Sequence, residues 1–297
     1  MAHSHILLGA GEVPAQLTIR HISLADLKEA LNKGADDFLA MPTHALFVGA
    51  IYPIVGLLLA RLAFGYSVLP LLYPLVAGFA LIGPVAALGL YELSRRREAG
   101  LDVSARHAFD VVNSSSIGAI VALGLLLLVL FALWVVTANA IYIANFGYLP
   151  PKSIGAFVDD MLTTEAGWRM IVAGNIVGFC FAVLALVISV ASFPLLLDRD
   201  VGAAVALGTS IRVVLANPVT MAVWGVIVAA LLVIGSLPAF LGLAVVMPIL
   251  GHATWHLYRH AVDASGSPLP TQHAPDDHKG RYAADFPAVL FPWSKDE

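Results

Sequence analysis

Long apolar runs alternate with short polar segments along most of the chain. Six of these runs are long enough to cross a bilayer, because a membrane-spanning helix needs about 20 apolar residues. The predicted spans are residues 43–62, 68–92, 115–138, 169–193, 216–235 and 237–258. The last two are separated by a very short turn at Gly235-Ser236-Leu237-Pro238, so the pattern predicts that they form an antiparallel pair.

One pattern of residues occurs twice, at a constant offset of 164 positions. The first copy comprises Pro74, Gly78, Ala80, Pro84, Tyr91, Leu93 and Arg95, and the second comprises Pro238, Gly242, Ala244, Pro248, Trp255, Leu257 and Arg259. We interpret this as duplication of a membrane unit, which places Glu92 of one copy opposite His256 of the other. Pro84 and Pro248 are predicted to kink equivalent helices.

The polar segments repeat as well. Residues 23–40 predict an amphipathic helix on the membrane surface, with a stripe formed by Leu24, Leu27, Leu31, Ala35 and Phe38. Lys28, Asp36 and Asp37 lie off this stripe, and Ser23 with Asp26 predicts a capping box. Residues 102–112 and 200–216 are weaker versions, with Asp102 and Asp200 as the predicted N-caps.

These patterns predict an all-α polytopic membrane protein with six transmembrane helices, built from three parallel repeats of a surface helix plus a transmembrane hairpin. The membrane domain covers residues 20–262, in units of about 20–98, 101–198 and 199–262. A flexible N-terminus (1–19) and a flexible cytoplasmic tail (263–297) are predicted to flank it. The tail ends in an aromatic cluster containing Phe286, Phe291 and Trp293, which predicts docking onto the membrane, the protein's own cytoplasmic face or a partner.

Composition supports the membrane class and sets the orientation. Apolar residues make up 59% of the chain and charged residues 12%, whereas soluble domains are about half apolar and a quarter charged. Of the 16 Lys and Arg residues, only Arg61, Lys152 and Arg169 fall on the side reached after the odd-numbered spans. The positive-inside rule therefore predicts that both termini are cytoplasmic. The net charge of −4, without a basic block, gives no indication of nucleic-acid binding.

Four longer motifs resemble those of a known family. They are Phe79-Ala-Leu-Ile-Gly-Pro84, Tyr91-Glu-Leu-Ser-Arg-Arg-Arg-Glu98, Phe193-Pro-Leu-Leu-Leu-Asp-Arg-Asp200 and Leu250-Gly-His-Ala-Thr-Trp-His-Leu-Tyr-Arg259. Over about residues 20–262 the chain resembles bacterial six-helix integral membrane proteins of unknown function, some of which are labelled putative cytochrome c oxidase subunit. The resemblance implies the bacterial inner membrane. Only His44, His252 and His256 lie in or near predicted spans, which is too few for a catalytic haem-copper oxidase subunit.

The end of the last predicted span carries the sharpest chemical candidate. His252, His256 and His260 are spaced i, i+4, i+8 and share one helix face. His252 and His256 could bind a metal ion or a haem, with Glu92 as a further ligand if the two copies meet. Alternatively, the histidines lie at headgroup level beside Trp255 and Tyr258 in an aromatic belt. The sequence assigns no cofactor.

The remaining candidates concern contacts with lipid or with other helices. The arginine cluster could bind anionic headgroups or an acidic partner, or act only as a topology anchor; it comprises Arg95, Arg96 and Arg97 beside Glu92. Trp255 and Arg259 mark the equivalent exit of the second copy. Gly174 and Gly178 form a small-xxx-small pattern that predicts close helix packing. Arg199 is predicted to pair locally with Asp198 and Asp200.

No predicted span carries a clear Asp, Glu, Lys or Arg near its centre, and no catalytic motif stands out. The leading hypothesis is therefore a non-enzymatic accessory or scaffold subunit that packs in the bilayer against a larger, respiratory or otherwise energy-converting, membrane complex. The alternative is a channel or carrier for a neutral or apolar solute along the kinked second and sixth spans. A third hypothesis is metal or haem binding at His252 and His256. The partner and the oligomeric state stay open.

Overall fold

The computed structural model describes residues 17–41, 54, 56–57, 69–148, 151–238, 240–267 and 269. Almost all of the first predicted span (43–62) lies outside the described residues. So does the aromatic cluster of Phe286, Phe291 and Trp293, together with most of the predicted tail.

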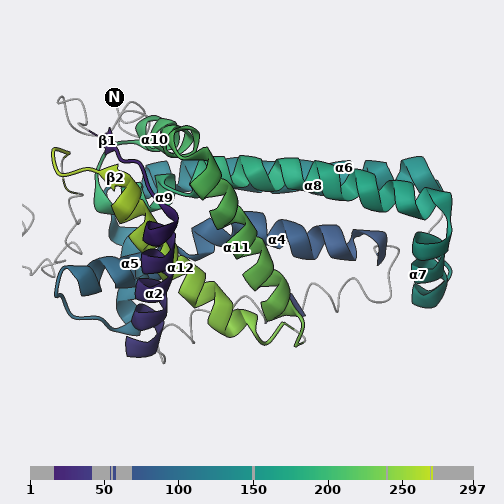
Figure 1. Ribbon diagram of the computed structural model, residues 1–297, viewed down its shortest axis with the longest axis horizontal. Coiled ribbons are helices and arrows are strands. Elements are labelled where there is room, and N and C mark those ends of the chain that lie inside the picture. Colours follow the sequence, from purple (N-terminus) through teal and green to yellow (C-terminus); the bar gives the residue numbers. More distant parts are fainter. Residues whose placement is uncertain are drawn as a thin grey trace, which may run out of the picture.

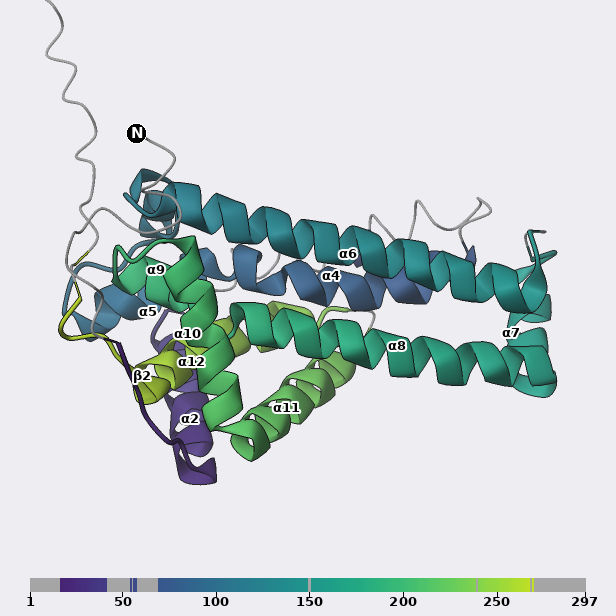
Figure 2. The same ribbon diagram turned by 90° about the horizontal axis from the view of Figure 1, so that it is seen from above.

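A long helical hairpin sets the length of the molecule. Helix α6 (Ile117–Phe146) and helix α8 (Glu165–Ser189) run side by side, and α7 (Ile154–Thr163) crosses their shared far end (Figures 1 and 2). Helix α4 (Leu72–Ala86), preceded by the 3₁₀ turn η1 (Leu69–Leu71), packs along the same hairpin. At 1.5 Å per residue the 30 residues of α6 extend about 45 Å, which matches a bilayer of about 40–45 Å including its headgroups.

Three described helical segments are long and apolar enough to cross a membrane: Ile117–Phe146, Glu165–Asp198 and Pro218–Ser236. The second comprises α8 and α9 (Ser192–Asp198), and the third is α11 (Pro218–Ser236). They contain most of the third, fourth and fifth predicted spans. Between 22% and 33% of the most apolar stretch of each is buried within the chain, so most of this surface faces outward.

The second and sixth predicted spans are not continuous apolar helices. Helix α4 ends at Ala86, just after Pro84, and α5 (Leu88–Glu98) begins after Ala87. This break agrees with the kink predicted at Pro84, because proline removes a backbone donor and crowds the preceding turn. Helix α12 (Leu243–Ala261) starts later than the predicted residue 237 and continues through Pro248. Residues 237–238 and 240–242 instead lie in the turn between α11 and α12.

The elements that carry most of the charge gather at the opposite end of the hairpin from α7, which we call the polar end. It contains α2 (Leu24–Ala40), α5, α9, α10 (Ala203–Ala216) and the C-terminal half of α12 (Figure 1). Its apolar core is fully enclosed and includes Phe193, Leu195, Leu196, Trp255 and Leu257, each at most 1% exposed. The polar end is thus a packed globular unit attached to long helices.

Helix α2 lies along α12, and the face of α2 that is buried differs from the predicted apolar stripe. The Ser23–Asp26 capping box is present as expected. The buried residues, however, are Leu27, Ala30, Gly34 and Asp37, whereas Leu24 is 57% exposed. A Cβ atom at Gly34 would lie 2.6 Å from the backbone nitrogen of Ala253, so the two helices touch backbone to backbone. The small residues and the histidines of α12 therefore set the orientation of α2.

The two ends of the described domain are joined. Strand β1 (Thr18–Ile19) pairs antiparallel with β2 (Val262–Asp263), and Arg20 forms an ion pair of 2.6 Å with Asp263. Asn217, at the corner between α10 and α11, accepts from the Ile22 amide (2.8 Å) and donates to the Arg20 carbonyl (3.1 Å). Residues 18 and 19 therefore belong to the ordered domain, which corrects the predicted boundary at residue 19.

The weaker surface helices differ from the prediction in form. Residues 105–113 form a 3₁₀ helix, η2 (Ala105–Asn113), that is capped by Ser104 and not by Asp102. Helix α10 begins after Gly202, at φ 75°, with no side-chain cap from Asp200. In both cases the chain turns into the helix two residues later than the Asp-Val pair suggested. The three-unit repeat stays a prediction.

Candidate functional site

Asp37 of α2 is the centre of a buried polar network between α2, α5 and α12. Its Oδ2 atom accepts from the Ser94 hydroxyl at 2.6 Å and lies 2.9 Å from His256 Nε2, while Oδ1 accepts from the Arg97 guanidinium. Ser94 Oγ in turn lies 2.7 Å from His252 Nδ1. Asp37 is 4% exposed and both Ser94 and His252 are fully enclosed. One carboxylate therefore holds three helices together.

The hydrogen-bond pattern defines the roles of these groups. Ser94 has one hydroxyl hydrogen, which it donates to the Asp37 carboxylate, so its oxygen is left to accept from His252 Nδ1–H. This assignment describes a neutral His252 protonated on Nδ1. Serine bridges the acid and the histidine here, whereas a hydrolase triad places histidine between the other two. The arrangement therefore gives Ser94 no general base and no access to a substrate.

Burial and hydrogen bonding perturb both ends of this network. Burial disfavours the charged form of Asp37, but hydrogen bonds from His256 and Ser94 and the nearby histidines outweigh it, so the pKa of Asp37 is lowered. Burial lowers the pKa of His252 to about 4, against the opposing influence of Asp37. At neutral pH the network thus contains a carboxylate, a neutral His252 and the Arg97 cation.

A second network links the two copies of the duplicated pattern. Glu98 of α5 accepts from the Trp255 indole at 2.9 Å and from Arg259 at 3.0 Å. Arg259 also reaches Asp198, which accepts from the Tyr258 hydroxyl at 2.8 Å. Burial and the Asp198 charge raise the pKa of Tyr258 well above its usual range. Trp255 and Tyr258 are each 1% exposed, so the predicted aromatic belt is wrong for these two residues.

The expected Glu92–His256 pairing does not form. Glu92 is buried on α5 and binds Arg95 through two bonds of 2.7 Å, with Arg96 at 3.9 Å. This carboxylate raises the pKa of Arg95. The copies do meet, but through Glu98 and Ser94, which lie on the face of α5 that contacts α12. The predicted local pair of Arg199 with Asp198 is present at 3.3 Å.

The arginine cluster is used mainly inside the chain. Arg95 binds Glu92, Arg96 binds Asp110 and the Asp102 carbonyl, and Arg97 binds Asp37. Arg97 is the most exposed, with 40% of its side chain accessible. Of the three arginines, Arg97 therefore offers the largest exposed surface for contacts outside the chain.

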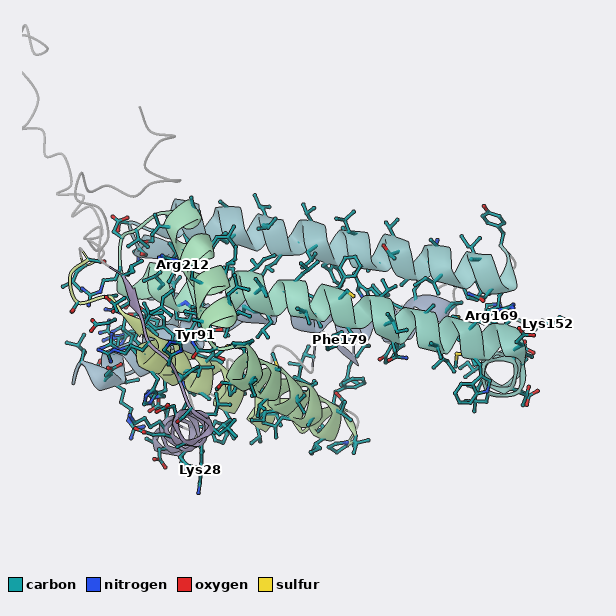
Figure 3. All side chains as sticks on the ribbon, turned by 45° about the horizontal axis from the view of Figure 1, so that its top comes forward. Lys28, Tyr91, Lys152, Arg169, Phe179 and Arg212 are labelled. Atoms are coloured by element: carbon teal, nitrogen blue, oxygen red, sulfur yellow. The ribbon has the colours of Figure 1, made fainter. Side chains whose placement is uncertain are left out.

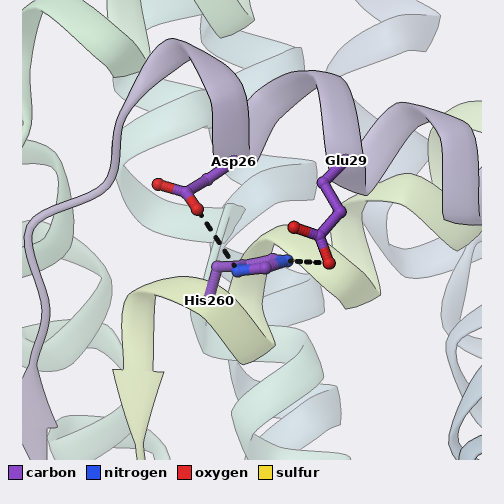
Figure 4. Close-up of side chains that lie close together, drawn as sticks. All are labelled: Asp26, Glu29 and His260. Carbon is purple, nitrogen blue, oxygen red and sulfur yellow. Dashed lines mark ion pairs between the residues drawn. The ribbon is translucent and has the colours of Figure 1, made fainter.

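His260 is flanked by two carboxylates of α2 (Figure 4). Its Nδ1 lies 3.6 Å from Asp26 and its Nε2 lies 3.7 Å from Glu29. One ligand atom from each residue fits within 4.8 Å of the others, so the group is a candidate metal site. The two acids, however, face opposite edges of the ring, and Glu29 is also paired with Lys33 at 2.8 Å. The two carboxylates therefore do not converge on one ring nitrogen, as the ligands of a single metal ion would.

A cavity of about 520 Å³ opens beside these networks. Its lining carries both signs of charge and comprises Arg20, Lys33, Asp36, Asp37, Arg97, Glu98, His256, Arg259 and His260. Most of these groups are already paired within the chain, so the cavity offers no excess of one charge to select a ligand.

The remaining predicted contacts lie on the long hairpin. A Cβ atom at Gly178 would meet the Trp134 ring at 3.0 Å, so this glycine packs α8 against α6. Gly174 has open space around it. Figure 3 shows Lys152 and Arg169 at the far end, while Lys28 and Arg212 lie at the polar end. The described basic residues are thus distributed as the sequence predicted.

Residues 71–198 match a family model described as predicted integral membrane protein (DUF2189). This chain is an integral membrane protein. The matched region runs from the start of α4 to the end of α9 and contains the α6–α8 hairpin, in agreement with the apolar helices described above. The family is one of unknown function. The matched residues do not include α2 or α10–α12. No curated protein and no solved structure matches the chain.

Sequence reasoning found the histidine row but missed the acids that meet it. The pattern places Asp37 off the apolar stripe of α2, and it predicts no role for Glu98 or Asn217. A usable signal was present in Ala30 and Gly34, because small residues four positions apart mark a close-packed helix face. Asp37 follows Gly34 by three positions and so lies on that same face.

Proposed function

We propose that this protein is a non-enzymatic accessory or scaffold subunit that packs against a larger membrane complex in the bacterial inner membrane. The polar end, where the described part of the chain begins at residue 17 and ends at residue 269, faces the cytoplasm. The distribution of basic residues supports this orientation, because Lys152 and Arg169 are the described Lys and Arg residues at the far end. An energy-converting complex is the class of partner that the family resemblance implies.

The Asp37 network is the observation that carries the proposal. Ser94, His256 and Arg97 could serve catalysis in other settings, yet here they all bind one buried carboxylate, and His252 binds Ser94. Groups engaged in this way stabilise the packing of three helices. The polar end therefore fits the role of a rigid platform better than that of an active site.

The outer face of the α6–α8 hairpin supplies a surface for packing in the bilayer. Val172, Ile176 and Phe179 follow one another along α8 at 52%, 60% and 69% exposure. Spacings of three and four residues place them on one face of the helix. Gly174 is not part of this face: it lies on the other side of α8, four positions before Gly178, where a Cβ atom would meet nothing within 4 Å.

The geometry favours neither of the other two hypotheses. Gly78, a candidate pore position, would place a Cβ atom 2.6 Å from Trp134, and Gly242 would place one 2.7 Å from the Gly235 carbonyl oxygen. Both glycines serve close packing. A metal ion bound by His252, His256 and Asp37 would meet the Arg97 cation on the same carboxylate, which opposes cation binding.

Photo-crosslinking in native membranes tests the scaffold role. A photoreactive amino acid is placed at Ile176 or Phe179, and a matched control is placed at Phe181, whose ring packs against Trp134 at 5.6 Å. A complex subunit gives one adduct of reproducible mass from the outward positions and none from Phe181. Adducts to lipid alone from both outward positions, together with recovery of only the free chain in gentle detergent, would contradict the proposal.

A further inference from the structure

The α11–α12 pair is shorter than the hairpin beside it. Helix α11 has 19 residues, or about 28 Å, against about 45 Å for α6. The pair forms a V that leaves the polar end, closes between Ser236 and Leu243 and returns. Along the length of the hairpin, its closed end lies level with the middle part of α8 and well short of α7 (Figures 1 and 2).

The position of Phe179 on α8 gives the distance along the hairpin between the closed end of the V and the far end. Figure 3 shows Phe179 on α8 near the level of the closed end. This residue follows Glu165, the first residue of α8, by 14 positions, which corresponds to about 21 Å of helix. Since the hydrocarbon core is about 30 Å thick, a turn at this level lies inside the core and does not reach the far aqueous phase.

The chemistry of the closed end agrees with that depth. Leu237 and Leu241 are 78% and 67% exposed, and Val233 and Ile234 beside them are 62% and 59% exposed. No charged residue occurs between Arg212 and Arg259. The connection between α6 and α8, by contrast, carries Lys152, Asp159 and Asp160. Exposed leucines and absent charges are what a turn in hydrocarbon requires.

Several backbone donors in and beside the turn are paired within it. Phe240 N–H donates to the Ser236 carbonyl at 3.1 Å, Leu241 N–H to the Pro238 carbonyl at 3.0 Å, and Leu243 N–H to the Phe240 carbonyl at 3.1 Å. Pro238 has no N–H to satisfy. Irregular backbone is excluded from lipid because unpaired polar groups are costly there, and this turn pairs these donors by short-range bonds.

We propose that α11 and α12 form a re-entrant hairpin, which enters the membrane from the polar end, turns between Ser236 and Leu243 within the hydrocarbon core in contact with lipid, and returns to the same side. This replaces the two complete crossings predicted at 216–235 and 237–258. Both topologies leave the termini on one side, so the distribution of Lys and Arg does not distinguish them.

Site-directed spin labelling of the full-length protein in lipid nanodiscs tests the proposal. Labels are placed at Leu241 or, independently, at Leu237, in a Cys180→Ser background that removes the single native thiol. Leu133→Cys, on the exposed face near the middle of α6, serves as the lipid-facing control. Tyr148→Cys, 87% exposed at the far end, serves as the aqueous control. Collision rates with oxygen and with a water-soluble nickel complex are compared.

A re-entrant hairpin makes Leu241→Cys and Leu237→Cys behave like Leu133→Cys, with frequent oxygen collisions and few nickel collisions. Nickel collisions as frequent as those of Tyr148→Cys would show that the turn reaches water and would overturn the proposal. Low collision rates with both reagents would show that protein covers the turn, which would overturn the lipid contact. Variants enter the comparison only if they elute as the parent does and keep its helical circular-dichroism signal.

Discussion

Replacement of Asp37 by asparagine is the sharpest test of the polar end. Asp37→Asn keeps the size and shape of the side chain but removes the charge that Ser94, His256 and Arg97 share. The amide oxygen can still accept from one neighbour, while the amide NH₂ group then faces a donor. The network loses its centre, although nothing in the apolar packing has changed.

The cost follows from the contacts. Hydrogen bonds to a charged group contribute about 1.5–3 kcal/mol each, and two of them, from Ser94 and His256, lie at buried positions. The Arg97 contact contributes less, because 40% of that side chain is exposed. After partial recovery through the amide oxygen, we expect a loss of about 2–3 kcal/mol. That corresponds to a fall of about 4–12 °C in the unfolding temperature for a chain of this size.

The assay is thermal unfolding in nanodiscs, followed by tryptophan fluorescence, at pH 7. Asp36→Asn is the matched control, because it removes the same charge one residue away at an exposed position of α2. We expect the control to stay within about 0.5 kcal/mol of the parent. Equal shifts for the two variants would refute the reasoning, since they would show that the buried network contributes no more than a surface charge.

Three other perturbations have definite expected outcomes. Gly34→Ala should destabilise the folded protein by about 1–3 kcal/mol, because the added methyl group clashes with Ala253, and thermal unfolding measures the loss. Gly208→Ala on α10 is the control: it has open space around it and should be neutral or slightly stabilising, because alanine favours the helix. Asn217→Ala should raise amide hydrogen exchange in residues 18–22, because it leaves the Ile22 amide and the Arg20 carbonyl without partners, and unchanged exchange there would contradict the assigned role. Because the folded-state pKa of His252 is lowered to about 4, its contribution to stability should be full above the unfolded pKa of 6.5 and fall as the pH drops from 6.5 to about 4. His252→Gln should flatten this part of the plot of stability against pH, and a variant that keeps the slope would contradict this role of His252.

The apolar pattern predicted the long helices well, because a run of 20 or more apolar residues has few alternatives to a membrane helix. The Ser23–Asp26 capping box and the break after Pro84 were likewise readable, since both depend on neighbouring residues alone. These features are local, and local physics decides them.

The polar end could not be predicted in the same way. Asp37 meets His256 across 219 positions of sequence, and no local property of α2 distinguishes an acid that faces histidines from one that faces water. The aromatic belt predicted at Trp255 and Tyr258 fails for the same reason, because a single sequence does not reveal which chain segment covers an aromatic ring. The depth of the α11–α12 turn depends on helix tilt, which hydropathy does not encode.

The pairing of β1 with β2 bears on the order in which the chain is made. Arg20 leaves the ribosome early, whereas Asp263, its partner, follows 243 positions later, after α12. Contacts between distant segments are the slowest to form, because the intervening chain must first be ordered. Until α12 has been made, α2 lacks the helix that covers its Leu27–Ala30–Gly34 face. The finished C-terminal part therefore completes the polar end, and a truncated chain lacking α12 would leave this face of α2 uncovered.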